Sequence, residues 1–139
     1  MNLDDFGDRH GIVNDLVNYA DSLTKELSKG GDANDWGQIY RFREKLLAIK
    51  DFIVVAHNLT YVLAQMDDMK QSDEDSKWTF TLEKELNTFV KKCLMNRIDS
   101  LIDCSRLWSF EDYRARNFQN ELRQKMTMLR DWYKEEYDL

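Results

Sequence analysis

Two histidines, two cysteines and a few pairs of carboxylates are the side chains in this sequence that could do chemistry. Neither His10 nor His57 lies in the Glu-x-x-His pattern of di-iron carboxylate bundles, and two histidines support neither a zinc site nor a Ser/His/Asp triad. Asp99 and Asp103 are one helical turn apart and could share a divalent cation, because magnesium prefers oxygen ligands. Nothing nearby in the sequence completes a coordination shell, so a metal-dependent hydrolase is only a third hypothesis. The sequence predicts a protein with no catalytic residue, no metal and no cofactor.

The acidic N-terminus and the two cysteines bear on metal binding and on the cellular compartment. The run from Asp4 to Asp8 matches a DDxxD spacing that can hold magnesium, but we interpret it as acids at the start of a helix, where the dipole favours negative charge. A signal peptide begins with basic residues instead, so the protein is expected to be unprocessed and cytoplasmic.

Cys93 and Cys104 would lie about 16 Å apart on one helix, too far for a disulfide, so both are predicted to be free thiols.

Arg116, Arg123 and Arg130 recur every seven residues, which places them along one flank of a helix. Guanidinium groups bind carboxylates and phosphates, so this arginine stripe could bind an acidic protein surface or a nucleic-acid backbone. The simpler interpretation is a solvated flank whose aliphatic stems cover the edge of the core. A net charge of −6 argues against general nucleic-acid binding, because phosphate contacts need Lys and Arg. A helical subunit of a nucleic-acid-containing assembly is therefore the alternative hypothesis.

The composition is that of one globular domain, with 42% apolar and 33% charged residues among 139. A chain of about 150 residues buries roughly 68–70% of its unfolded surface, so one domain needs no disulfide or metal. No apolar stretch approaches the about 20 residues that cross a bilayer, so no contact with a membrane is expected. The chain has no proline, and its five glycines all precede residue 38, which predicts long uninterrupted helices.

Apolar periodicity and capping residues predict four helices. The first ends at Gly30 and Gly31, and the second begins with a capping box of Asp35 and Gln38. A polar, acidic loop precedes the third helix, and a second capping box, Ser109 with Asp112, begins the fourth. The predicted ranges are about 13–27, 35–69, 77–107 and 109–133. Short loops between them predict an all-α, antiparallel four-helix bundle that forms one domain over residues 1–139.

The second predicted helix carries more apolar surface than one core face requires. At about 100° per residue, its expected core arc consists of Phe42, Leu46, Ile49, Phe52, Ile53, Val55, Ala56, Leu59, Val62, Leu63 and Met66. A second, narrower row, which we call the apolar seam, consists of Tyr40, Leu47, Val54 and Tyr61. One polar row beside the seam holds Arg43, Lys50 and His57, and the other holds Glu44, Asp51, Asn58 and Gln65.

The apolar seam has two interpretations. It could pack against the protein's own helices, because scattered apolar residues are normal on surfaces. It could instead bind a partner, because an apolar row between a basic and an acidic row is the layout of a helix-pairing surface. An antiparallel second copy would bring Arg43 and Lys50 near Glu44 and Asp51 of its partner, so a homodimer would be self-complementary. His57, at the edge, is interpreted as a boundary residue.

The four tryptophans all lie near helix ends. Alternating helix direction would bring Trp36 and Trp108 to one end of the bundle and Trp78 and Trp132 to the other, where they would close the core. If the tryptophans are exposed instead, they are strong candidates for interface anchors, because Trp is enriched at such positions.

The leading hypothesis is a non-enzymatic, acidic helical protein that binds a partner protein and regulates or inhibits it. The apolar seam with Arg43 and Lys50 is its predicted binding surface, and the arginine stripe is the surface for an anionic partner. Small inhibitory or neutralising proteins of bacteria and their phages offer an analogy of composition and fold.

Overall fold

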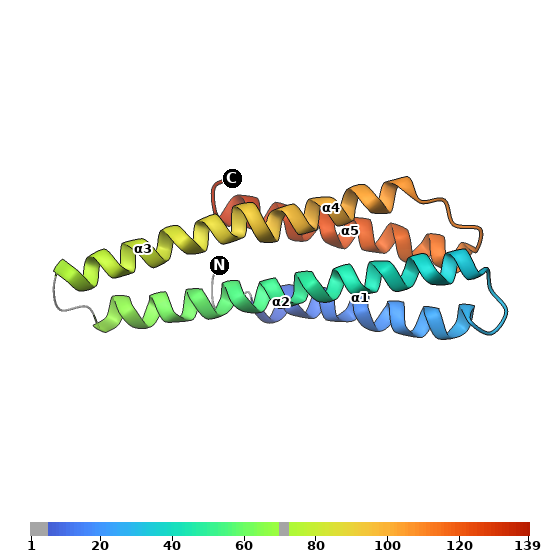
Figure 1. Ribbon diagram of the computed structural model, residues 1–139, viewed down its shortest axis with the longest axis horizontal. Coiled ribbons are helices and arrows are strands. Elements are labelled where there is room, and N and C mark those ends of the chain that lie inside the picture. Colours follow the sequence, from blue (N-terminus) through green and yellow to red (C-terminus); the bar gives the residue numbers. More distant parts are fainter. Residues whose placement is uncertain (1–5, 70–72) are drawn as a thin grey trace.

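The computed structural model describes residues 6–69 and 73–139, and over these residues the chain is all-α, as predicted. Four helical rods form an antiparallel bundle (Figure 1). They are α1 (Phe6–Leu27), α2 (Ala33–Met69), a continuous rod built from α3 (Asp73–Phe89), the π-helical segment η2 (Val90–Leu94) and α4 (Met95–Leu107), and α5 (Tyr113–Glu136).

The turn between α1 and α2 depends on two glycines. Gly30 has a φ of +153°, which L side chains rarely adopt, and a Cβ on Gly31 would lie 2.8 Å from the carbonyl oxygen of Leu27. Asp32 then caps α2, because its carboxylate accepts hydrogen bonds from the amides of Asn34 and Asp35 at 2.7 and 3.3 Å. The predicted end of the first helix is confirmed, but the predicted capping box that begins at Asp35 is wrong.

Asp35 instead joins the two loops at this end of the bundle. Its carboxylate is buried and accepts hydrogen bonds from the amides of Glu111, at 3.1 Å, and Asp112, at 2.9 Å. Asp112 in turn is the N-cap of α5 and accepts from the amide of Arg114 at 2.8 Å. The predicted box of Ser109 with Asp112 therefore places the helix start three residues too early.

The long third rod contains a π-helical turn that the sequence analysis did not predict. Its buried side chains recur every four residues, at Leu86, Val90, Leu94, Ile98 and Ile102. On a regular α-helix each such step turns the apolar row by about 40°, so four steps would turn it by about 160°. The wider turn at Val90–Leu94 absorbs part of this drift, and the row stays on the core side.

The core lies between all four rods where all four are present. From α2 it receives Ile39, Phe42, Leu46, Ile49, Ile53 and Ala56, each at most 1% exposed. Phe52 of α2 also packs edge-on against Phe89 of α3, with ring centroids 5.3 Å apart. Cys93 and Cys104 are both free, as predicted.

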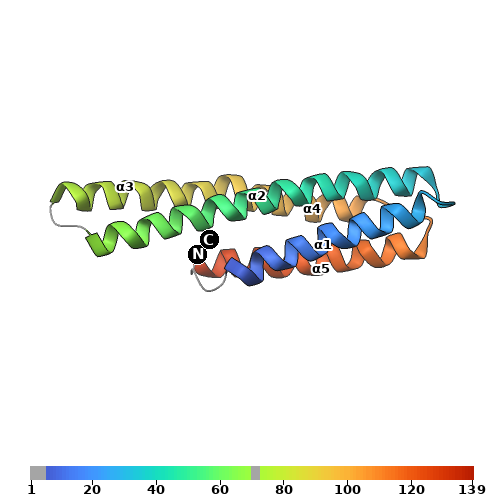
Figure 2. The same ribbon diagram turned by 90° about the horizontal axis from the view of Figure 1, so that it is seen from below.

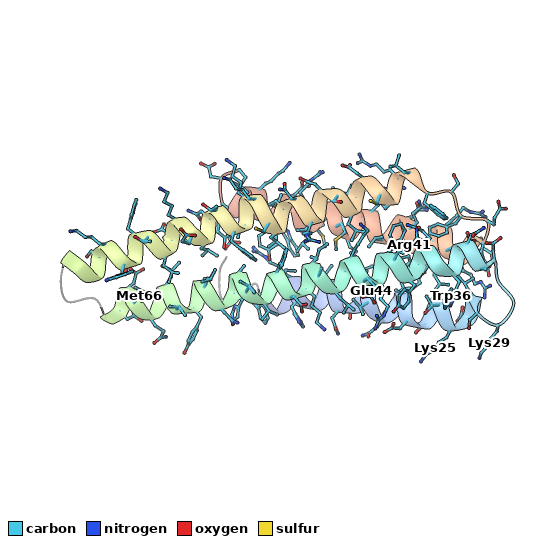
Figure 3. All side chains as sticks on the ribbon, in the orientation of Figure 1. Lys25, Lys29, Trp36, Arg41, Glu44 and Met66 are labelled. Atoms are coloured by element: carbon cyan, nitrogen blue, oxygen red, sulfur yellow. The ribbon has the colours of Figure 1, made fainter. Side chains whose placement is uncertain are left out.

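The rods differ in length, which leaves part of the bundle with two helices only. Phe6, at the start of α1, stacks on His57, and Tyr137, just after α5, is hydrogen-bonded to Thr60. Beyond these contacts α2 and α3 continue together to the tip, well past the ends of α1 and α5 (Figures 1 and 2). We call residues 61–69 and 73–82 the hairpin extension. Figure 3 marks Met66 in this part and Trp36 near the opposite end.

The hairpin extension explains why one prediction about tryptophan fails. Trp78 lies in the extension and is 61% exposed, whereas Trp132 belongs to α5, which ends short of the tip. The predicted closure of this end of the bundle by the two indoles is therefore wrong.

Candidate functional site

The apolar seam of α2 is only partly covered by the rest of the protein. Tyr40 and Tyr61 are 48% and 52% exposed, and Leu47 and Val54 are half-buried. Trp36 extends the seam by one turn, because its ring stacks on Tyr40 with centroids 6.3 Å apart. The structure thus brings the predicted side chains together on one surface.

Val55 and Val62 enlarge this surface, although the helical periodicity predicts them in the core. They are 41% and 43% exposed and lie seven residues apart, so they form a row parallel to the seam. The predicted core arc was too wide, because α1 and the third rod cover only part of it. We call the apolar seam together with Val55 and Val62 the outer face of α2.

The outer face belongs to the most apolar helix of the described chain. A window of 18 residues within Ala33–Asp68 has a mean hydropathy of 1.5, yet only 22% of it is buried. By length and composition α2 could cross a membrane, which contradicts the expectation that no stretch is long enough. Core helices of soluble proteins meet the same criterion, but they are mostly buried. The low burial is therefore the notable feature.

The basic residues beside the seam face α1. Arg43 forms an ion pair with Asp21 and a second one, at 2.9 Å, with Glu44, and the hydrogen bond to Asp21 raises its pKa. Lys50 donates a hydrogen bond to the side chain of Asn14 at 2.9 Å. Both groups have partners within the chain, so pairing with the acidic row of a second copy would compete with these contacts.

His57 packs at the point where α1 begins. Its ring stacks on Phe6 with centroids 4.0 Å apart and an angle of 22°, and Phe6 also contacts His10. No hydrogen-bond partner for the buried Nδ1 of His57 exists among the described residues. The histidine thus contributes packing between α1 and α2.

Each arginine of the predicted stripe has an intramolecular partner. Arg116 donates to the carbonyl oxygens of Phe110 and Glu111 at 3.2 and 3.0 Å. Arg123 donates to the carbonyl of Ser105 at 3.3 Å, and Arg130 pairs with Asp99 at 3.9 Å. Arg123 thus satisfies a carbonyl in the last turn of α4, where carbonyls are orphaned because the helix stops, and Arg116 satisfies two carbonyls of the loop before α5. Binding of an anionic partner by this stripe stays a prediction.

Two buried polar contacts were missed by the sequence analysis. Gln119 of α5 donates to the carbonyls of Ser105 and Trp108 and so helps to cap α4. Arg9 of α1 is buried, pairs with Glu136 of α5 at 2.5 Å and lies over the ring of Tyr133 at 4.6 Å. Burial raises the pKa of Tyr133, and it raises the pKa of Tyr137 to about 12. Both contacts depend on partners distant in sequence, so periodicity carries no signal for them.

The candidate metal ligands do not assemble into a site. Within 6–69 and 73–139, no three or more His, Cys, Asp or Glu side chains come close enough to hold an ion. Asp99 faces Arg130 instead, and Asp4 and Asp5 of the predicted DDxxD run lie outside the described residues.

Comparison with protein-family models, with curated proteins and with solved structures found no match for this chain.

Proposed function

We propose that this chain is a non-enzymatic, helical protein-binding module that regulates or inhibits a partner protein through the outer face of α2. The observation that carries the proposal is the low burial of the most apolar stretch, 22% at a mean hydropathy of 1.5. Exposed apolar surface that is contiguous and rimmed by charged residues is typical of protein interfaces. Tyr40 and Trp36 add aromatic side chains, which are common anchors of such interfaces.

A protein partner explains this surface better than a bilayer does. The opposite face of α2 is packed into the core through six side chains that are at most 1% exposed. Insertion of α2 into a membrane would remove it from α1, from the third rod and from the interhelical contacts of Arg43 and Lys50. A partner protein covers the outer face and leaves the core intact.

Site-specific photo-crosslinking in the native host tests the proposal. A benzophenone amino acid at Val55 or Val62 is expected to give one discrete protein adduct. Tyr113 is the matched control, because it is an aromatic residue of α5 that is 64% exposed, away from the outer face. Val62→Asp is expected to abolish the adduct formed at Val55, since loss of a central apolar contact weakens binding by about 30-fold or more.

Two results would contradict this function. Equal labelling from Tyr113 would mean that the adducts reflect random encounter. Flotation of the purified protein with lipid vesicles, lost in Val62→Asp, would assign the outer face to a membrane.

A further inference from the structure

A groove opens between the third rod and the residues that follow α5, and none of the described residues of α2 lines it. Its volume is about 540 Å³. Phe80, Lys84, Lys91 and Lys92 line it from α3 and η2, and Tyr137 and Leu139 line it from the end of the chain. In Figure 1 this end of the chain lies beside the middle of the third rod. The groove is therefore separate from the outer face of α2.

The wall of the groove that follows α5 is held in place by contacts within the chain. Tyr137 stacks on Tyr133 with ring centroids 6.3 Å apart and is hydrogen-bonded to Thr60 of α2. The amide of Leu139 donates a hydrogen bond to the carbonyl oxygen of Lys134 at 2.9 Å. The groove is therefore shaped before a ligand arrives, and a preformed site loses less conformational entropy on binding.

The groove combines uncovered apolar side chains with an excess of positive charge. Phe80 and Leu139 are 68% and 42% exposed, so both have surface that a ligand can bury. The lining holds three lysines and one acid, Glu83, which gives a local charge of +2 on a chain whose net charge is −6. Within residues 6–69 and 73–139, the ammonium groups of these three lysines form no hydrogen bond and no ion pair. The site thus suits a ligand that is both apolar and anionic.

We propose that this groove binds an acidic peptide segment of a partner protein, with an apolar side chain against Phe80, Tyr137 and Leu139 and carboxylates on the lysines. A peptide meets both demands of the site, because it carries apolar and acidic side chains on one short chain. A nucleic acid offers phosphates without the apolar side chains, and the net charge of −6 opposes a long polyanion. A lipid bilayer is flat, whereas this site is a hollow between two segments of the chain.

The spacing of the lysines along the third rod defines the ligand further. Lys84 and Lys91 are seven residues apart, about 10 Å along the rod, and lie on the same helical face as Phe80. Phe80 precedes Lys84 by four residues, about 6 Å along the rod. The ligand is therefore expected to carry two carboxylates about 10 Å apart, which is two turns of a helix, and an apolar side chain about 6 Å beyond one of them.

The size of the site sets the expected strength of binding. One exposed aromatic ring and three exposed lysines make few contacts, and each exposed charge pair contributes little. The Kd is therefore expected to lie between about 10 and about 300 μM and to rise with ionic strength.

Fluorescence anisotropy with a labelled helical peptide of about 15 residues, which has leucines along one side and glutamates beside them, tests the charge recognition. The same peptide with glutamine in place of glutamate is expected to bind at least about 10-fold more weakly. Lys84→Glu combined with Lys91→Glu is expected to weaken binding of the glutamate peptide at least about 10-fold, because it brings like charges together. Lys25→Glu combined with Lys29→Glu is the matched control, because it makes the same change of net charge at the end of the bundle where Figure 3 labels both lysines. It should change the Kd less than about two-fold at about 0.1 M salt, since distant charges are screened.

A second pair of variants tests the apolar part of the site. Phe80→Ser is expected to weaken binding of the glutamate peptide at least about 5-fold with an unchanged Tm, because the ring is exposed in the free protein. Tyr113→Ser removes an aromatic side chain of α5 that is 64% exposed and does not line the groove, so the Kd should stay the same.

Three results would overturn the proposal. The first is a glutamate peptide that does not bind at about 1 mM. The second is binding that stays unchanged in the groove lysine variant or in Phe80→Ser. The third is a thymidine oligonucleotide that binds more tightly than the peptide and loses its binding in the groove lysine variant, which would assign the lysines to a nucleic acid. The crosslinks at Val55 and Val62 are independent of all three results, and their loss would contradict only the function proposed for the outer face.

Discussion

Asp35 fixes the geometry at the loop end of the bundle. Its carboxylate is buried in α2 and accepts hydrogen bonds from backbone amides 76 and 77 residues further along the chain. Asp112, next in this chain of contacts, starts α5, and its bonds to Arg114 hold its pKa at about 2. One side chain thus links the start of α2 to the start of α5.

Asp35→Ala is expected to lower the free energy of unfolding by about 1–3 kcal/mol, because it leaves the amides of Glu111 and Asp112 without their acceptor. Urea unfolding measures the change. Asn34→Ala, in the same turn but exposed, is the control and should change stability by less than about 0.5 kcal/mol. Equal effects of the two substitutions would mean that the buried acceptor contributes nothing.

At the scale of elements, α2 has one face that is packed in the core and one face that is exposed. The inner face packs against α1 and the third rod, and the outer face carries exposed Tyr40, Val55, Tyr61 and Val62. The third rod keeps its own apolar row on the core through the π-helical turn at Val90–Leu94. Regular helical periodicity therefore explains the core face of each rod. It does not explain the exposed valines of α2 or the π-helical turn of the third rod.

Ile53→Asp and Val55→Asp distinguish the two faces of α2 with the same new side chain. Ile53 is fully buried, so its replacement places a charge in the core and is expected to cost about 3–5 kcal/mol of stability. Val55 is 41% exposed, and its replacement should cost less than about 1 kcal/mol. Chemical denaturation of both variants gives the comparison. A large loss in Val55→Asp would return this position to the core arc.

At the scale of the whole molecule, the unequal lengths of the rods set the distribution of stability. Four rods share a core from the loop end to about His57, and beyond it only α2 and α3 pack together. Isolated helix pairs bury little apolar surface, and regions with few buried contacts open at lower cost than the core. The hairpin extension is therefore expected to be the least stable helical part of the described chain.

Amide hydrogen exchange on a dilute sample tests this distribution. Amides at positions 61–68 and 76–82 are expected to exchange at least about 100-fold faster than those at 42–56, which corresponds to about 3 kcal/mol of local stability. Equal protection of extension and core at high dilution would contradict the expected difference.

The sequence by itself determined the all-α class and the number of rods, because these depend on local periodicity and on Gly30 and Gly31. It also identified the apolar seam, since excess apolar surface on one helix is visible in a helical wheel. The tertiary structure alone decided that Val55 and Val62 are exposed, because the width of a buried face depends on where neighbouring helices end. The partners of Asp35, Arg9 and Gln119 were likewise decided by folding, since such contacts join residues that no local pattern relates.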